Sequence, residues 1–374
     1  MSKKIKILYT IPNFDTAGSG KVLYDLAKGL DKEKFEVSIV CRNSKGSFFS
    51  EIEKLGVPIF FIETSKPLRP YSTLYFRIKP FINFLKQHQF DLVHSWNWSS
   101  DWSEVLATRL SGAKFVYTKK AMTWGNIHWK IKSYLAHFII TINEEMKSYF
   151  SYKKSQKLIS LGLDINYYTP NLFSRNLNTS DFKIITVANL VAVKGIEVLI
   201  EAIHKLRNPK IHLEILGNYG IEILDDGSEY DYYGFLQELV SDLNMTSQVT
   251  FLGGKKDVRP FLVNSDLYVI PTLNKGRKEG MPMALVEAMA MGVPVLGSNI
   301  SGINFVLKDF PTLQFNAGDS DDLSQKIHLF CKQSDDEKNQ LGKKLRDYCI
   351  HHFSANTFVK LHEDLYVQLM KNKS

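Results

Sequence analysis

The chain has 374 residues, of which 44% are hydrophobic, and this length and composition suit two globular domains, each with its own core. The formal net charge of +8 is uneven, because residues 1–168 hold 25 Lys and Arg against 14 Asp and Glu. Three cysteines (Cys41, Cys331 and Cys349) exclude a disulfide framework or a CxxC metal site, which favours a reducing compartment such as the cytoplasm. No apolar run approaches the roughly 18 residues of a membrane span, and the N-terminal apolar segment is too short for a signal-peptide core.

The first half alternates short apolar runs with helical patterns. Residues 4–10 predict a buried strand, the Gly-rich segment 16–20 predicts a turn, and apolar spacing over 21–30 predicts a helix. Further strands are expected at 35–41, 58–62, 91–94, 114–118 and 138–143, with a helix through Phe84. Repeated strand and helix units predict a parallel, doubly wound sheet with ligands at the carboxyl ends of its strands.

The basic excess of the first half coincides with aromatic clusters at 76–86 and 124–134. Basic side chains beside apolar ones are suited to binding anionic lipid headgroups or a phosphate-rich acceptor. A solvated basic face with no partner is the alternative. Nucleic acid is not favoured, because no recognised binding motif accompanies the charge.

A polar stretch at 171–180 marks the expected linker. We therefore predict an N-terminal domain over 1–170, a linker over 171–181 and a C-terminal domain over 182–353. The alternation then resumes with strands expected at 183–188, 211–216, 249–252, 267–271 and 293–297 and helices at 195–206 and 233–243. The amphipathic pattern over 354–370 predicts a last helix, and residues 354–374 are expected to pack back near the N-terminal domain.

Residues 279–295 carry the most constrained motif. Pro282 suits the first turn of a helix, and Gly292 suits the position just past its end, so a helix of about ten residues is expected. Glu279 lies in the turn before this helix, and Glu287 lies two turns in, only about 80° further round the axis. Both carboxylates can therefore face one ligand, and a helix N-terminus favours an anion such as a diphosphate. An ordinary surface loop and amphipathic helix is the alternative.

Lys194 lies in the connection between a predicted strand and a predicted helix. Its charge suits a pyrophosphate leaving group, whose developing negative charge must be stabilised in the transition state. An exposed lysine at a helix N-terminus is the alternative reading. The presence of the 279–287 motif in the same half favours the phosphate role.

Taken together, these segments resemble a retaining glycosyltransferase of family 4 with the two-domain GT-B fold, over essentially the whole chain. The matching segments are 17–27, 91–97, 159–164, the Lys194–Gly195 pair, 216–220, and Glu279 with Glu287 as the family's E-x7-E motif. The resemblance implies two doubly wound Rossmann-like domains that face each other across a cleft, of which the N-terminal domain binds the acceptor and the C-terminal domain binds the nucleotide sugar. It also implies transfer of a sugar from a nucleotide-sugar donor to a glycan or lipid-linked saccharide acceptor, in cell-envelope polysaccharide synthesis.

The resemblance also implies roles for single residues. Glu279 is expected at the donor sugar hydroxyls, Glu287 at the ribose hydroxyls and Lys194 at the diphosphate, with Glu279 and Lys194 as the catalytic pair. The remaining expected donor contacts are Gly18, Ser19, Asn189, Gly217, Gly280, Met281, Pro282, Met283 and Leu285. The family needs no protein nucleophile, because the leaving phosphate helps to deprotonate the acceptor, and usually no metal. No cofactor is therefore expected, and the donor is expected to be a UDP- or GDP-sugar.

The sequence departs from the family pattern at two positions. Asn189 aligns with a common arginine, and asparagine supplies hydrogen bonds but no charge. Lysines stand at 119–120 where the family often has a histidine, so Lys120 is a candidate for phosphate or acceptor contact, or a surface lysine. His94 is the nearest remaining histidine at a strand end, and we keep it as a candidate acceptor residue.

Other nucleotide motifs are excluded, and other functions stay open. Residues 17–21 end like a Walker A loop, but Asp15 and Val22 stand where Gly and Ser or Thr are needed, and Leu23 breaks the G-x-G-x-x-G fingerprint. A nucleotide-sugar-binding pseudoenzyme is one alternative, and a GT-B epimerase or phosphorylase is another. The few scattered cysteines predict a cytoplasmic protein, and the basic, aromatic first half favours a peripheral position on the inner face of the plasma membrane.

Overall fold

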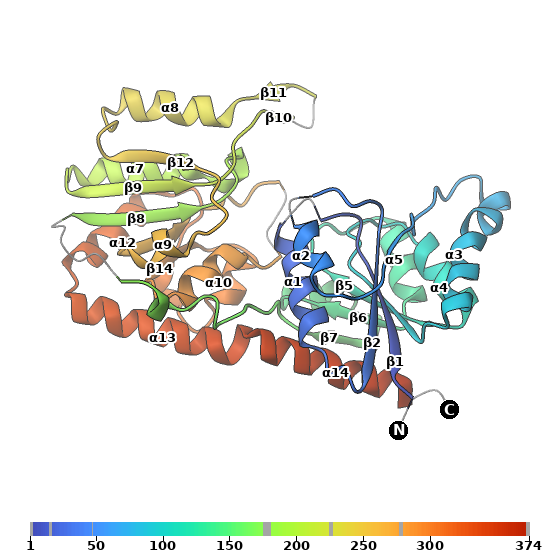
Figure 1. Cartoon of the computed structure of the whole chain (residues 1–374). Coiled ribbons are helices and arrows are strands. Elements are labelled where there is room, and N and C mark those ends of the chain that lie inside the picture. The colour runs from blue at the N-terminus through green and yellow to red at the C-terminus, as the bar shows by residue number, and fades with distance from the viewer. Residues whose placement is uncertain are drawn as a thin grey trace. The chain divides into compact units, whose positions relative to one another are not determined.

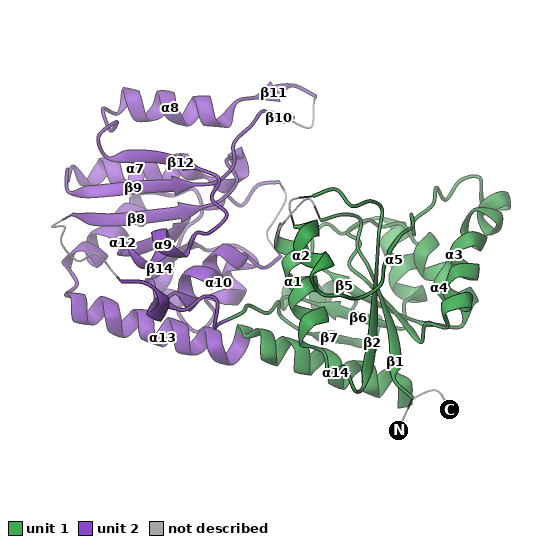
Figure 2. Cartoon of the chain, in the orientation of Figure 1, with its two compact units in different colours: residues 1–164, 353–374 green, residues 165–352 purple. Residues whose placement is uncertain are grey.

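The structure, a computed structural model, describes residues 3–14, 17–46, 48–174, 181–223, 227–276 and 280–371. The chain forms two compact units: unit 1 comprises Met1–Asp164 and Phe353–Ser374, and unit 2 comprises Ile165–His352 (Figure 2). Most of the predicted linker, at 175–180, lies outside the described residues. Asp164 is the last residue of unit 1 in this division, and residues 165–168 are held within unit 2 by contacts described below.

Unit 1 is built on a seven-stranded parallel sheet in the order β3-β2-β1-β4-β5-β6-β7 (Figure 1). Its strands are β1 (Ile5–Thr10), β2 (Phe35–Cys41), β3 (Ile59–Phe61), β4 (Leu92–Ser95), β5 (Lys114–Lys119), β6 (Phe138–Thr141) and β7 (Gln156–Leu158). Its helices are α1 (Ala17–Gly29), α2 (Phe49–Glu53), α3 (Leu74–His88), α4 (Ser103–Ser111), α5 (Ile127–Leu135), α6 (Glu145–Tyr149) and α14 (Ala355–Lys371), with a 3-10 turn η1 (Tyr71–Thr73).

Side chains alternate between the two faces of this sheet, as the period of a strand requires. Leu8 and Val93 are paired neighbours on β1 and β4, and both belong to the core cluster that includes Ile78 and Phe81 of α3. The next residues along each strand, Tyr9 and His94, face the opposite side, where α14 covers them. The last helix of the chain is therefore part of the unit 1 core.

Unit 2 contains a six-stranded parallel sheet in the order β12-β9-β8-β13-β14-β15. Its strands are β8 (Phe182–Val187), β9 (Ile211–Leu216), β12 (Val249–Gly253), β13 (Leu267–Ile270), β14 (Val295–Ser298) and β15 (Gln314–Phe315). Outside this sheet, β10 (Glu222–Ile223) pairs antiparallel with β11 (Glu229–Tyr230). Its helices are α7 (Ile196–Leu206), α8 (Tyr232–Asp242), α9 (Arg259–Val263), α10 (Met283–Ala290), α11 (Ile303–Val306), α12 (Ser320–Lys332) and α13 (Asp335–Phe353), with 3-10 turns η2 (Pro170–Leu172), η3 (Ala192–Lys194) and η4 (Pro311–Leu313).

The predicted class, two Rossmann-like α/β domains with parallel sheets, is confirmed. One local prediction is wrong: α1 begins at Ala17, so Gly18, Ser19 and Gly20 lie in its first turn and not in a turn before a helix at 21. Glycine disfavours helix interiors, which hides a helix start of this kind from the sequence pattern. Among the described residues, no helix is long and apolar enough to span a bilayer.

Candidate active site

Lys194 occupies a tight connection between β8 and α7. It ends the turn η3, and the next residue, Gly195, has φ of 63°, a left-handed conformation. A Cβ atom on Gly195 would lie 2.3 Å from the carbonyl oxygen of Pro271, just after β13. The backbone N–H of Leu273 also donates to the carbonyl of Val193 at 2.8 Å. Glycine at 195 therefore lets the Lys194 connection lie directly against the loop that leads from β13 towards the 279–287 motif.

Gly217 permits a second close approach at the same edge of the sheet. A Cβ atom there would lie 1.7 Å from the carbonyl oxygen of Ala188, so only glycine fits. The backbones after β8 and β9 continue to pair, since Leu190 N–H donates to the Asn218 carbonyl at 2.8 Å. Asn189 lies between these contacts with an exposed side chain. The expected donor-site residues 189, 194 and 217 thus cluster at the carboxyl ends of β8 and β9.

The 279–287 motif is only partly visible, because Glu279 lies outside the described residues. Gly280, Met281 and Pro282 are buried, and α10 begins at Met283 with Pro282 as its N-cap and not in its first turn. The helix ends as predicted: Gly292 has φ of 71°, and Val293 N–H donates to the Ala288 carbonyl at 3.1 Å in a Schellman arrangement. Leu285 is fully buried, so its side chain belongs to the core.

Glu287, about one turn into α10, is half-buried and interacts with Tyr168. Burial first, and then the Glu287 carboxylate that accepts a hydrogen bond from it, raise the pKa of the Tyr168 hydroxyl. The guanidinium of Arg346 donates to the Tyr168 carbonyl at 2.7 Å, which anchors the segment that carries the tyrosine. The sequence did not reveal Tyr168 as a neighbour of this carboxylate, because the two residues are far apart along the chain.

The preceding residue, Tyr167, is held by Arg259. The guanidinium carbon lies 3.5 Å from the ring centroid of Tyr167, and Arg259 donates to the Tyr167 carbonyl at 2.9 Å. Asp257 orients that guanidinium through two hydrogen bonds of 2.7 and 2.8 Å. Residues 165–168 therefore form a fixed part of the wall beside Glu287.

In unit 1, Lys120 and Ser19 meet although neither is near the other in sequence. The Lys120 ammonium donates to the Ser19 hydroxyl at 3.0 Å and lies 5.5 Å from the ring centre of Trp96 and 5.4 Å from that of Trp98. Burial and then Lys132 lower the pKa of Lys120 to about 7. Gly18 beside them is exposed, with open space where a Cβ atom would stand. Two of the expected phosphate-contacting residues thus lie at one place.

Two further buried lysines stand close to Lys120. Lys119 lies 3.5 Å from the ring centre of Trp129, and burial and then Lys132 lower its pKa to about 7. Lys132 donates to the Ser99 carbonyl at 2.9 Å, and burial lowers its pKa to about 8, while Glu104 acts in the opposite direction. Glu104 is fully buried and accepts hydrogen bonds from Thr10, Ser95 and Asn97. Nothing in the helical pattern around Glu104 distinguished it from a surface carboxylate.

His94 is fully buried beneath α14. Its ring nitrogens lie 2.6 Å from the Tyr366 hydroxyl and 2.7 Å from the Thr118 hydroxyl, so both are engaged within the core. Burial, followed by His362 and Lys120, lowers the pKa of His94 well below its usual value. This environment is that of a structural histidine, kept neutral by desolvation.

Among the residues that the structure describes, no three His, Cys, Asp or Glu side chains group together in a way that could hold a metal ion. Lysines lie at the carboxyl ends of both sheets, Lys120 in unit 1 and Lys194 in unit 2. Their ammonium groups suit phosphate oxygens.

Two family models match separate parts of the chain. The model described as Glycosyltransferase Family 4 matches residues 16–159, and the model described as Glycosyl transferases group 1 matches residues 169–348. The UDP-Gal:alpha-D-GlcNAc-diphosphoundecaprenol alpha-1,3-galactosyltransferase of Escherichia coli is 24% identical over 388 residues, which covers 92% of each chain. The capsular polysaccharide biosynthesis glycosyltransferase CapH of Staphylococcus aureus is 23% identical, covering 82% of this chain and 85% of its own.

Solved structures show the same fold. A glycosyltransferase from Rickettsia africae superimposes with a TM-score of 0.85 at 19% identity, covering 99% of this chain and 100% of its own. Anabaena HepE in complex with UDP has a TM-score of 0.80 at 18% identity, covering 97% of this chain and 100% of its own. At these identities the likeness establishes the architecture, and the residue contacts described above are properties of this chain.

Proposed function

The chain belongs to the family 4 glycosyltransferases and is a hexosyltransferase of the retaining type, and on this premise we propose how its residues hold the donor. The observation that carries the proposal is the Lys194 connection, hydrogen-bonded to the loop after β13 that leads to the E-x7-E motif. Lys194 binds the donor diphosphate. Gly217 has no side chain, so the diphosphate can approach the backbone at that position. Glu279 binds hydroxyls of the transferred sugar, and Glu287, positioned by Tyr168, binds the ribose hydroxyls.

The proposed reaction uses charge stabilisation and no protein nucleophile. The bond between the anomeric carbon and the diphosphate oxygen breaks, and the acceptor hydroxyl oxygen bonds to the same face of that carbon. The acceptor proton passes to an oxygen of the departing nucleoside diphosphate. Lys194 and the backbone N–H groups of Gly280, Met281 and Met283, at the start of α10, stabilise the charge that develops on the leaving group, without a metal ion.

We propose a UDP-sugar as donor and a lipid-linked saccharide as acceptor. Support comes from HepE, which is described in complex with UDP, and from the E. coli relative, whose name specifies UDP-Gal and a diphosphoundecaprenol-linked acceptor. In unit 1, Lys120 and Ser19 present an ammonium and a hydroxyl that suit a phosphate oxygen.

A lipid-linked acceptor is best reached from the membrane surface, so we place the protein in the cytoplasm, peripheral on an anionic membrane. Around η1 and α3, three aromatic side chains are more than half exposed: Tyr71 at 53%, Tyr75 at 51% and Phe76 at 69%. Arg69 and Lys79 flank them in the sequence. Exposed aromatics beside basic residues are suited to the headgroup region of anionic lipids.

The test is donor binding followed by transfer. UDP at a concentration of about 100 Kd stabilises a protein by about 2.7 kcal/mol, which a thermal-shift measurement detects. We expect UDP to stabilise the wild type and to bind Lys194→Ala at least about tenfold more weakly, since a charge-assisted phosphate contact is lost. Lys205→Ala is the matched control, because Lys205 is a surface lysine of the same unit paired with Asp321 at 2.6 Å.

Transfer is then measured with UDP-hexoses and a GlcNAc-diphosphate lipid. Wild-type affinity and transfer in folded Lys194→Ala protein would refute the assignment. Donor binding without turnover on any acceptor would instead indicate a nucleotide-sugar-binding protein, the alternative that Asn189 prompts.

A further inference from the structure

Unit 1 contains a polar pocket that the donor assignments do not use. It has a volume of about 220 Å³ and lies at the carboxyl ends of four strands. Asn13 follows β1, Arg42 follows β2, Glu63 and Thr64 follow β3, and Trp98 follows β4. Pockets for drug-sized ligands span about 300–1,000 Å³, so this one suits a single sugar ring and not a whole lipid-linked substrate.

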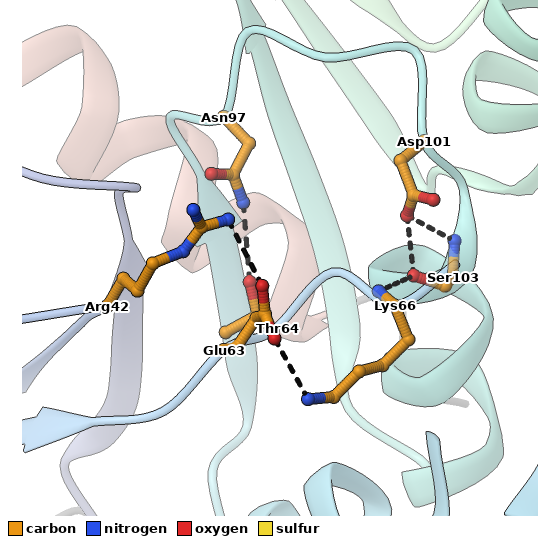
Figure 3. Close-up of polar contacts among 7 residues, drawn as sticks. All are labelled: Arg42, Glu63, Thr64, Lys66, Asn97, Asp101 and Ser103. Carbon is orange, nitrogen blue, oxygen red and sulfur yellow. Dashed lines mark hydrogen bonds and ion pairs between the residues drawn. The ribbon is translucent and has the colours of Figure 1, made fainter. Parts of the chain in front are cut away.

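One wall of the pocket is a carboxylate held between two cations. The Glu63 carboxylate lies 3.1 Å from Arg42 and 3.2 Å from Lys66, which approach it from different sides (Figure 3). Arg42 and Glu63 both line the pocket and remain about half exposed, at 62% and 46% of their side chains. Exposed ion pairs contribute little to the free energy of folding. Arg42 and Glu63 can therefore turn their N–H groups and oxygens to a ligand with little loss of protein stability.

The loop that carries Glu63 and Thr64 is held by hydrogen bonds from the segments beside it. The backbone N–H of Lys66 donates to the Ser103 hydroxyl at 2.8 Å, and Ser103 in turn donates to Asp101 (Figure 3). Asn97 is buried, and its amide donates to Glu104 at 2.8 Å and to Thr64 at 3.4 Å. The polar groups of the pocket are therefore held in place before a ligand arrives, which reduces the entropy lost on binding.

The pocket also has an aromatic wall. Trp98 is 39% exposed and lines the pocket, and its ring centre lies 5.4 Å from the Lys120 ammonium. Lys120 in turn contacts Ser19, which the proposed function places at a substrate phosphate. An indole face suits the apolar C–H face of a sugar, while a paired carboxylate and guanidinium suit its hydroxyls.

We propose that this pocket binds the neutral terminal sugar of the acceptor, with Glu63 and Arg42 reading its hydroxyls and Trp98 stacking on its ring. The inference rests on the proposed function, since it names the acceptor that receives the hexose. Arg42 and Glu63 are the charged residues that line the pocket, and their charges cancel, so the lining offers no unpaired cation to the carboxylate of a uronic acid and a neutral ring is favoured.

The test uses methyl glycosides of glucose, galactose and N-acetylglucosamine as probes, with methyl glucuronide as the charged comparison. Ligand-observed NMR measures their binding to the full chain. We expect a neutral glycoside to bind the wild type, and Glu63→Gln and Trp98→Ala each to weaken it about tenfold, while Trp98→Phe retains part of the affinity. Glu51→Gln is the matched control, because Glu51 has a similar exposure and pairs with Lys54 at the same i,i+3 spacing as Glu63 with Lys66.

UDP-induced stabilisation of the same variants separates this inference from the proposed function. UDP should stabilise Glu63→Gln and Trp98→Ala as it does the wild type. If no neutral glycoside binds, if binding is unchanged in both variants, or if the glucuronide binds as tightly as the neutral probes, the pocket is not the acceptor site. If UDP fails to stabilise the wild type, the donor assignment fails, whatever the glycosides do.

Discussion

Gly195→Ala tests the claim that glycine allows the Lys194 connection to lie against the loop after β13. Two costs are expected. The left-handed φ of 63° costs a non-glycine residue roughly 1–2 kcal/mol. In addition, the new Cβ would lie 2.3 Å from the Pro271 carbonyl oxygen and 3.0 Å from the Leu273 side chain. Because backbone must shift to relieve the first contact, we expect a total loss above about 3 kcal/mol.

Gly276→Ala separates the two costs. Gly276 has a similar φ of 57°, and no atom of the described residues lies within 4 Å of an added Cβ, so the conformational cost is the one that applies. For a unit of this size, 1 kcal/mol lowers Tm by about 2–4 °C, so Gly276→Ala should lose about 2–8 °C and Gly195→Ala more than about 6 °C. Gly195→Ala should also weaken UDP binding, since Lys194 is displaced. Equal Tm losses in the two variants would refute the argument from close approach.

Two further predictions concern pH and membranes. Burial lowers the pKa of His362 to about 4, so the folded state keeps it neutral while the unfolded state takes up a proton below about 6.5. The free energy of unfolding therefore falls as pH drops from about 6.5 to about 4, by about 2 kcal/mol at pH 5. His362→Leu should remove this part of the pH dependence of Tm. His351→Gln is the control, since His351 is exposed, and it should keep the pH dependence. Binding to anionic vesicles should fall with added salt, and replacing Tyr75 and Phe76 by serine should weaken it about tenfold, since both residues are more than half exposed and can insert among the lipids. Leu329→Ser on α12 is the control, because Leu329 is also exposed but lies outside this surface, and it should leave vesicle binding unchanged. Vesicle binding that neither salt nor the changes at Tyr75 and Phe76 alter would contradict the proposed membrane surface.

The sequence predicted what depends on local pattern. Apolar runs placed both parallel sheets, and Gly292 placed the end of α10, because helix termini and buried strands have characteristic residues. Contacts between distant segments could not be predicted in this way. Tyr168 reaches Glu287, and Lys120 reaches Ser19, only after the sheets have assembled. The pattern also gave no means of recognising Glu104 as a buried carboxylate, since its three hydrogen-bond donors come from β1 and from β4 with the loop after it.

The strand orders explain why both candidate sites arise where they do. In unit 2 the chain moves outward from β8 to β9 and β12 and then returns to place β13 on the other side of β8. The Lys194 connection and the loop after β13 therefore lie side by side at this reversal, the position at which open α/β sheets bind ligands. Unit 1 repeats this reversal, because β2 and β3 lie on one side of β1 and β4 on the other. The polar pocket lies at that reversal, with residues that follow β1, β2, β3 and β4. Open α/β sheets bind ligands at such switch points, and the side chains decide the chemistry. We propose phosphate for Lys194 and the N-terminus of α10 in unit 2, and a neutral sugar for the paired carboxylate and the indole in unit 1.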